Sequence, residues 1–293
     1  MQKQIKVSQE DFKTYLKGIG LPTDIKLSVS VETLYLLANK QLIYTFYQNT
    51  VLHLKDSKPI SLEFSDILQR LCVQKIGGLC YEHELLFYYI LKHIGFNVEL
   101  IQCFVQEAGC PYDPEFPTTH AFLYVTIGDD ETYLIDPGFG TRSLRFPMKV
   151  NFKDLDATYN LFPLEHYRFT ENESHYQFQH LIDDKWVTYY HFFKPLKYAT
   201  IEEIHNDYHY LFTYEKFSGV RDNRFQLCKY TEQGKIQFFW FRIEKKFTSF
   251  KKIFKFDEVK KIEYKSYEEL KDDIKKELGF DLPEFHLVKS NEN

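Results

Sequence analysis

The spacing of apolar residues changes near residue 95, and this change restricts the folds open to the chain. Before that point the apolar residues recur at helical spacing, most clearly at Phe87, Ile90, Leu91 and Ile94. Gly95 follows as a helix terminator. Beyond it the apolar residues alternate, which predicts strands over residues 98–105, 119–127 and 132–136. Helices followed by antiparallel strands indicate the α+β class.

Capping and breaking signals predict the other elements. Ser8 with Asp11 resembles a capping box that opens a first helix, and Ser65 is expected to cap a later one. Further helices are expected after Ser30, near residues 201–205 and over residues 266–278; further strands are expected over residues 176–182, 186–193, 224–230 and 235–243. A length of 293 residues suggests two or three domains.

Composition excludes several classes of protein. A net charge of -5 argues against a nucleic-acid binder, and the absence of an apolar run of about 18 residues argues against a membrane span. The first ten residues lack the apolar core of a signal peptide. Five irregularly spaced cysteines favour neither a disulfide framework nor a zinc site, so we expect no bound metal and reduced thiols in the cytoplasm. Aromatic residues make up 18% of the chain, enough for a Phe/Tyr-filled core and for aromatic-lined clefts.

The segment Gly77-Gly78-Leu79-Cys80-Tyr81-Glu82 carries the clearest chemical signal. Two glycines allow a tight turn just before a helix, and Cys80 then lies in the first turn of that helix. Unpaired N–H groups and the helix dipole stabilise a thiolate at such a position. Taken alone, however, a free cysteine is more often a small buried hydrophobic residue.

His120 and Asp136 lie on two neighbouring predicted strands. A three-residue loop at 128–130 places Ile127 opposite Glu131, so Asp136 falls diagonally to His120 on one sheet face. The plainer alternatives are a histidine satisfied at a strand end and an aspartate that begins a Pro-Gly turn. Together with Cys80, the two residues form a nucleophile, base and orienting acid, a combination more specific than any of its parts.

These motifs resemble the arylamine N-acetyltransferase family. The family's Gly-Gly before a Cys-aromatic-Glu segment matches Gly77 to Glu82, its histidine matches His120, and its Asp-Val-Gly-Phe-Gly matches residues 136–140. The resemblance is strong from about residue 45 to 140 and weaker beyond. It implies three domains: a helical bundle with the cysteine (1–95), an antiparallel β-barrel with the histidine and acid (96–198), and an α/β lid (199–293), around a catalytic core like that of cysteine proteases and transglutaminases.

The chain departs from the family pattern at several positions. Ile76 replaces an arginine and Gln48 a glutamate, two residues that look like an ion pair in the family, so we expect Gln48 to lie near Ile76. Thr141 replaces a glycine in the region that helps to hold the coenzyme A pyrophosphate. Residues 206–210 are bulkier than the family's Ser/Thr-rich segment.

The resemblance implies acetyl-CoA-dependent N-acetylation of arylamines or hydrazines by a ping-pong mechanism through a Cys80 thioester, with acetyl-CoA as co-substrate and no permanently bound cofactor. The backbone N–H of Tyr81 is expected to stabilise the oxyanion. Expected substrate or coenzyme contacts are Phe139, Gly138, Gly140, Thr141, Tyr112, Phe217 and Tyr208. Two alternatives stay open: another thiol-based acyl transfer, such as amide synthesis or hydrolysis, and a non-catalytic binding protein on the same fold.

Overall fold

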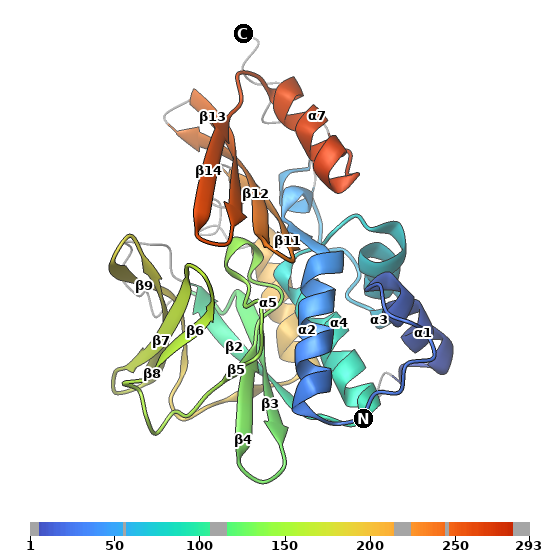
Figure 1. The fold of residues 1–293 in the computed structure, drawn as a ribbon, viewed down its shortest axis with the longest axis vertical. Helices are drawn as coiled ribbons and strands as arrows, with labels where there is room; N and C mark the ends of the chain where they lie inside the picture. Colours follow the sequence, from blue (N-terminus) through green and yellow to red (C-terminus); the bar gives the residue numbers. More distant parts are fainter. Residues whose placement is uncertain (1–5, 55–56, 106–115, 214–223, 244–245, 284–293) are drawn as a thin grey trace.

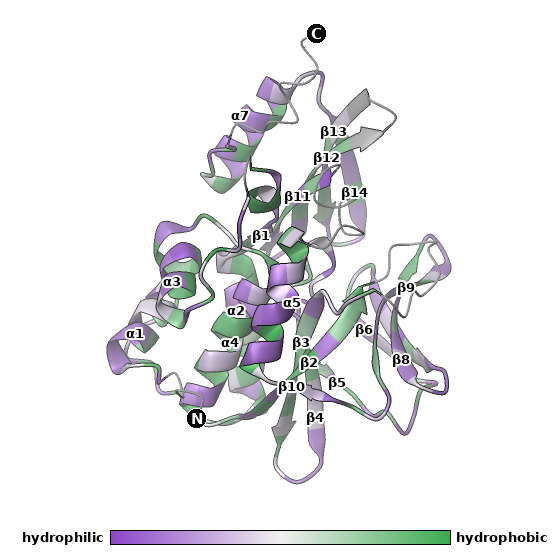
Figure 2. Cartoon of the chain, turned by 180° about the vertical axis from the view of Figure 1, so that it is seen from behind, coloured by the Kyte–Doolittle hydropathy of each residue, from purple (hydrophilic) through white to green (hydrophobic). Residues whose placement is uncertain are grey.

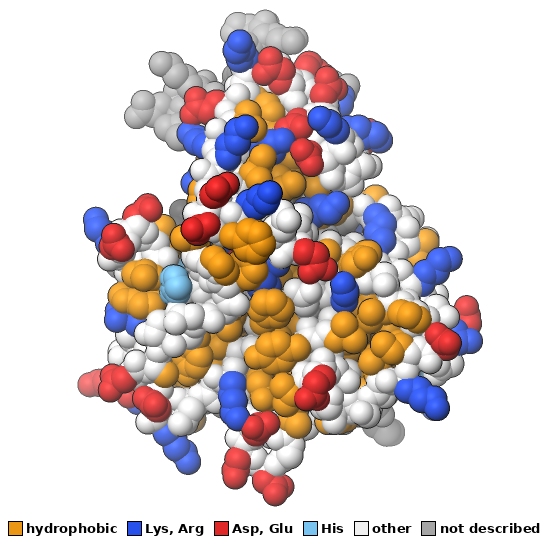
Figure 3. Space-filling model, viewed as in Figure 1, with side chains coloured by type: hydrophobic (Ala, Val, Ile, Leu, Met, Phe, Trp, Pro, Cys, Tyr) orange, Lys and Arg blue, Asp and Glu red, His pale blue; other side chains and the backbone are white. Residues whose placement is uncertain are grey.

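The computed structural model describes residues 6–54, 57–105, 116–213, 224–243 and 246–283. Figure 1 shows a helical part and a β-barrel side by side, with a C-terminal sheet and a helix above them. This is the α+β architecture that the sequence predicts. Within the described residues no helix is both long and apolar enough to cross a membrane. Acidic and basic side chains are interspersed on the face drawn in Figure 3, as expected for a surface with little net charge.

The helical part consists of α1 (Gln9–Gly18), α2 (Val31–Tyr44), α3 (Phe64–Leu68), the π-helical turn η2 (Gln69–Gln74) and α4 (Cys80–Ile94). The predicted capping box at Ser8 and the left-handed terminator at Gly95 are both confirmed. The predicted cap at Ser65 is wrong, because the N-cap of α3 is Glu63, two residues earlier, and Ser65 lies inside the helix. Burial of Leu34, Leu37, Leu85 and Ile90 joins these helices into one core.

The barrel is a nearly closed antiparallel sheet in the order β5-β4-β3-β2-β9-β8-β7-β6, with β10 paired to β2. Its strands are β2 (Asn97–Val105), β3 (His120–Ile127), β4 (Glu131–Ile135), β5 (Met148–Lys149), β6 (Thr158–Phe162), β7 (Glu165–Glu171), β8 (His175–Ile182), β9 (Lys185–Phe193) and β10 (Tyr198–Ala199). Alternate residues point inward and form an aromatic core that includes Phe122, Phe178 and Phe192.

The C-terminal sheet contains β11 (Arg224–Thr231), β12 (Gly234–Ile243), β13 (Lys246–Lys255) and β14 (Glu258–Glu263), and α7 (Tyr267–Leu278) covers one of its faces. In Figure 2, hydrophilic and hydrophobic residues alternate along α7, whose buried side carries Leu270 and Ile274. The short strand β1 (Phe46–Gln48), from the helical part, completes this sheet beside β11.

Two elements pack in a different part of the molecule from the one to which the predicted domain limits at residues 95 and 198 assign them. Strand β1 belongs to the C-terminal sheet, although its sequence lies in the helical part. Helix α5 (Ile201–Thr213) buries Ile204 and Tyr208 in the core of the helical part, although it follows the barrel in sequence. The limits themselves stay a prediction, but the three parts are joined by shared elements as well as by surface contacts.

Candidate active site

The turn before Cys80 is shaped by β1, which runs beside it. Gly77 has a φ of +71°, and a Cβ there would lie 2.5 Å from the ring of Phe46. The N–H of Gly78 donates to the carbonyl of Phe46 (3.2 Å), and the N–H of Gln48 donates to the carbonyl of Gly78 (3.0 Å). The side-chain oxygen of Gln48 accepts a hydrogen bond from the backbone N–H of Thr50. The expected proximity of Gln48 to Ile76 stays a prediction. The two glycines allow β1 to hold this turn by backbone bonds.

Glu82 holds the start of α4, the helix that begins at Cys80. Its Oε2 accepts the N–H of Leu79 (2.9 Å), which caps α4, and its Oε1 accepts from Nε of Arg70 (2.7 Å). Sequence reasoning missed Arg70, because nothing local relates a residue of η2 to the turn ten positions later. The ion pair is a fixed support for the first turn of α4, where Cys80 lies.

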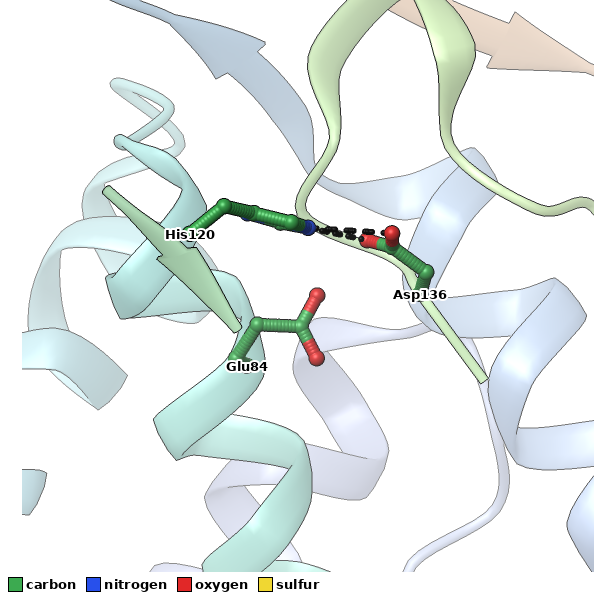
Figure 4. Close-up of side chains that lie close together, drawn as sticks. All are labelled: Glu84, His120 and Asp136. Carbon is green, nitrogen blue, oxygen red and sulfur yellow. Dashed lines mark hydrogen bonds and ion pairs between the residues drawn. The ribbon is translucent and has the colours of Figure 1, made fainter. Parts of the chain in front are cut away.

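His120 and Asp136 are in direct contact. The register Ile127 to Glu131 is as predicted, and it brings Nε2 of His120 to 3.1 and 3.0 Å from Oδ1 and Oδ2 of Asp136. Figure 4 shows this contact between the end of β4 and the start of β3. Both side chains are buried, and Nδ1 of His120 has no hydrogen-bond partner among the described residues. The carboxylate thus holds the ring through Nε2 and leaves Nδ1 without a hydrogen bond from the described residues.

The sulfur of Cys80 lies beside the strand that carries His120. Sγ donates a hydrogen bond to the carbonyl oxygen of Thr119 at 3.9 Å. Thr119 is the residue directly before His120. Burial raises the pKa of the Cys80 thiol well above its ordinary value, and the Glu84, Asp136 and Glu82 carboxylates add to the rise, while the N–H of Tyr81 lowers it. The expected stabilisation by the helix terminus is thus outweighed by burial. A thiolate at this position requires a cation beside it, and the imidazolium form of His120 would supply one.

Glu84 is a fourth polar side chain in this cluster, and sequence reasoning missed it. It lies one helical turn after Cys80, is fully buried, and accepts the N–H of Gly138 at 2.7 Å. Figure 4 shows its carboxyl group beside the imidazole ring of His120 and the carboxyl group of Asp136. The available signal was its position four residues after Cys80, on the same side of the helix.

Glu84, His120 and Asp136 are also the one group of described residues close enough to share a cation, with one ligand atom from each lying within 4.8 Å of the others. Nε2 of His120 is already bound to both oxygens of Asp136, however. We therefore interpret the group as a hydrogen-bonded cluster, and the prediction that the site needs no metal stands untested.

A cleft of about 1130 Å³ opens above this cluster, between the barrel and the C-terminal sheet. Cys80, His120, Gly138, Phe139 and Thr141 line it on the barrel side. From the C-terminal sheet it is lined by Phe239, Phe241, Lys252 and Phe254. The pocket is concave, and its lining combines aromatic rings with both basic and acidic side chains, which suits a ligand with aromatic and charged parts.

Other predicted contact residues lie elsewhere. Gly140 packs against the ring of Tyr47 behind the cleft, and a Cβ there would lie 2.9 Å from that ring. Tyr208 is buried against Tyr81, with ring centroids 6.1 Å apart, and does not line the cleft. The structure therefore does not bring Gly140 or Tyr208 to the cleft surface. Gly140 packs in the turn after Asp136, and Tyr208 packs between α5 and the helical core. Tyr112 and Phe217 lie outside the described residues.

Comparisons with known proteins agree with this architecture. A family model for N-acetyltransferases matches residues 30–287. An arylamine N-acetyltransferase of Mycobacterium tuberculosis is 30% identical over 127 residues, which cover 43% of this chain and 44% of that protein. The chain thus matches about half the length of such curated relatives.

Solved structures resemble the fold over nearly its whole length. The arylamine N-acetyltransferase of M. tuberculosis superposes with a TM-score of 0.78 at 19% identity, covering 96% of this chain and 97% of that one. The Mycobacterium marinum enzyme in complex with CoA gives a TM-score of 0.75 at 19% identity, covering 92% of each chain. The extended family match together with this fold shows that the chain belongs to the arylamine N-acetyltransferase family.

Proposed function

We propose that this protein transfers an acetyl group from acetyl-CoA to an arylamine or hydrazine through a thioester on Cys80. The observation that carries the proposal is the contact of His120 with both carboxylate oxygens of Asp136, in the wall of the cleft that Cys80 also lines. A base oriented in this way beside a thiol is the arrangement that nucleophilic acyl transfer requires.

In the first step, Nδ1 of His120 takes the proton of the Cys80 thiol, and the thiolate attacks the acetyl carbonyl carbon. This step requires the Cys80 side chain to turn away from the carbonyl of Thr119 and to bring Sγ to Nδ1, which has no hydrogen-bond partner among the described residues. The N–H of Tyr81, which faces the sulfur, donates to the oxyanion. The thioester bond of the donor breaks, and the departing thiolate of coenzyme A takes the proton back from His120.

In the second step, the amine nitrogen attacks the Cys80 thioester, and His120 accepts the proton that the nitrogen loses. The C–S bond breaks, the amide is released, and the Cys80 thiolate is restored beside the imidazolium. The ring of Phe139 lies 4.7 Å from that of His120, centroid to centroid, and forms part of an aromatic wall. This wall is where a flat aromatic amine would lie.

The outer part of the cleft suits the coenzyme. Arg142 follows Thr141 and lies 3.9 Å above the ring of Tyr189, and Lys252 faces the cleft from β13. Cations at the rim provide charge for phosphate groups. A similarly folded enzyme has been solved with CoA, which supports the same donor here. The four described cysteines are free thiols, which fits a reducing compartment such as the cytoplasm.

The test is a mass measurement of the intact protein after incubation with acetyl-CoA, followed by addition of aniline or phenylhydrazine. We expect the mass of one acetyl group to be added, to disappear when the amine is present, and to be absent in Cys80→Ala. Cys72→Ala serves as the matched control, because Cys72 is also a buried free thiol but lies outside the cleft.

The other outcomes would replace the proposal with a named alternative. An adduct that water discharges as fast as the amine does would indicate a hydrolase. No adduct from acetyl-CoA, together with an adduct from an acylated carrier protein, would indicate a different acyl transfer. Binding of CoA without any adduct would indicate a non-catalytic protein.

A further inference from the structure

Glu84 is placed where the nucleophile helix and the acid-bearing turn meet most closely. Its Oε1 accepts the N–H of Gly138 at 2.7 Å. A Cβ at position 138 would lie 2.5 Å from the carbonyl oxygen of Cys80 and 2.7 Å from Oε1 of Glu84. Only a glycine fits between the two elements, so the Glu84 carboxyl group is held directly against the turn that follows Asp136.

The surroundings of Glu84 contain several groups that carry or can acquire negative charge. Asp136 faces it from the end of β4, Cys80 from its own helix, Cys103 from β2 and Tyr190 from β9. His120, on β3, is the remaining titratable group of the cluster. Two buried carboxyl groups this close together cannot both be ionised without a large cost, so one of them must keep a proton.

The hydrogen bonds indicate which carboxyl group keeps it. Both oxygens of Asp136 accept from Nε2 of His120, which stabilises the charged form of Asp136. Glu84 accepts a single backbone N–H, and its buried Oε2 accepts no hydrogen bond from the described residues, while the Asp136 carboxylate lies within hydrogen-bonding reach of the Glu84 side chain. Burial and the neighbouring Asp136 carboxylate raise the pKa of Glu84 well above its ordinary value, while the Gly138 N–H only partly opposes them.

We propose that Glu84 is a positioning residue that stays protonated at neutral pH and, through its acidic proton, holds the Asp136 carboxylate against His120. Asp136 then carries the only full negative charge of the carboxyl pair. A negative charge at Glu84 would raise the pKa of Cys80, because an ionised Glu84 carboxylate is one of the neighbouring charges that oppose the thiolate. A neutral Glu84 therefore makes ionisation of the Cys80 thiol less costly than a charged Glu84 would. The consequence for catalysis rests on the function proposed above, whereas the protonation state does not.

The experiment measures the rate of Cys80 alkylation by iodoacetamide against pH for the wild type, Glu84→Gln and Glu84→Leu. Glutamine is neutral and offers an N–H to Asp136, so the apparent pKa of alkylation is expected to stay unchanged. Leucine offers no donor, and alkylation at pH 7 is expected to slow on the order of ten-fold, the size of one lost hydrogen bond to a charged group. Glu99→Gln is the control, because Glu99 is a partly exposed glutamate paired with Lys92 and should alter neither quantity.

An infrared difference spectrum gives a second measurement. It does not depend on catalytic activity, and it does not require the Glu84→Leu variant to fold. We expect the C=O band of a protonated carboxyl group in the wild type at pH 7 and its loss in Glu84→Gln. Absence of that band, or a fall of the alkylation pKa by about one unit or more in Glu84→Gln, would show that Glu84 is ionised and would overturn the proposal. A metal ion retained through dialysis by the wild type and lost from Glu84→Gln would overturn it as well. None of these measurements uses acetyl-CoA, so failure of the acetyl transfer would be seen separately.

Discussion

The floor and the roof of the cleft are built in opposite ways. The floor brings Cys80, Glu84, His120 and Asp136 together from three elements, and all four side chains are buried. The roof is one face of the C-terminal sheet, where the partly exposed Phe239, Phe241 and Lys252 follow the alternation of β12 and β13. The floor is therefore a set of interdependent contacts, suited to one reaction, while the roof is a row of separate contacts, suited to selecting a ligand.

A buried ion cluster joins the two regions. Glu165, on β7, bonds to Lys235 of β12 at 3.2 Å and lies 4.0 Å from Nε of Arg145. Arg145 also donates to the carbonyl oxygen of Thr231, at the end of β11. The relative position of floor and roof thus depends on a few charged residues that are almost fully removed from water.

The strongest test of an interdependent floor is Asp136→Asn. The amide cannot hold the Nε2–H of His120 as a carboxylate does, so the ring loses its orientation and its stabilised charged form. We expect the rate of acetyl transfer to fall on the order of 10³-fold. Steady-state kinetics with acetyl-CoA measure it, with Asp130→Asn in the exposed hairpin loop as control. A loss below ten-fold would mean that the floor residues act independently.

The junction is tested by Glu165→Ala. The substitution leaves two buried cations, Lys235 and Arg145, without their carboxylate. We expect the free energy of unfolding to fall by about 3–5 kcal/mol in urea titrations. Glu131→Ala removes a carboxylate from an exposed pair with Lys149 and should leave the unfolding curve almost unchanged. Equal effects of the two substitutions would contradict the assignment of the Glu165 cluster as the connection between floor and roof.

Helix α5 supports the floor from behind through a titratable contact. Burial raises the pKa of Asp207 to about 6, although Thr118 (2.6 Å) and Gln102 (2.7 Å) donate to it and partly oppose the rise. A carboxyl group whose pKa is higher in the folded state binds more protons there, so its contribution to stability is present at low pH and is lost as pH rises from about 4 through 6.

Asp207→Asn should remove this dependence. The unfolding free energy of the wild type relative to the variant is expected to decrease by about 2 kcal/mol between pH 4 and pH 7. Urea unfolding of both proteins at the two pH values measures it, and the difference between them cancels the titration of Glu84. A difference that does not change with pH would show that folding leaves the pKa of Asp207 unchanged.

The smallest effect is expected on the roof, from Lys252→Ala. One cation at the rim of the cleft is worth ~1 kcal/mol, so KM for acetyl-CoA should rise about five-fold, and less so in high salt. Alkylation of Cys80 should not change, because Lys252 is separated from the floor by the cleft. Lys261→Ala is the matched control, since Lys261 pairs with Lys252 across β13 and β14 but does not line the cleft. A change in alkylation rate would mean that roof and floor are coupled.

Local patterns were sufficient for most of the helical part and for the strands that carry the site. The capping box at Ser8, the terminator at Gly95 and the loop between Ile127 and Glu131 each depend on a few neighbouring residues. Strand β1 and the last two strands of the C-terminal sheet, β13 and β14, were missed. β1 is too short to show a period, and β13 and β14 carry many lysines, which resemble a solvated surface.

The sequence alone determined that Cys80 begins a helix and that Asp136 falls within reach of His120. Glycine placement and strand alternation are local, and a three-residue loop leaves one register. Tertiary structure alone decided that Glu84 adds a second carboxyl group to the cluster, that Arg70 supports the turn, and that Tyr208 is withdrawn into the core. These outcomes depend on which buried side chains meet across elements far apart in the chain. These contacts follow from the packing of the whole core, which cannot be predicted from a local sequence pattern.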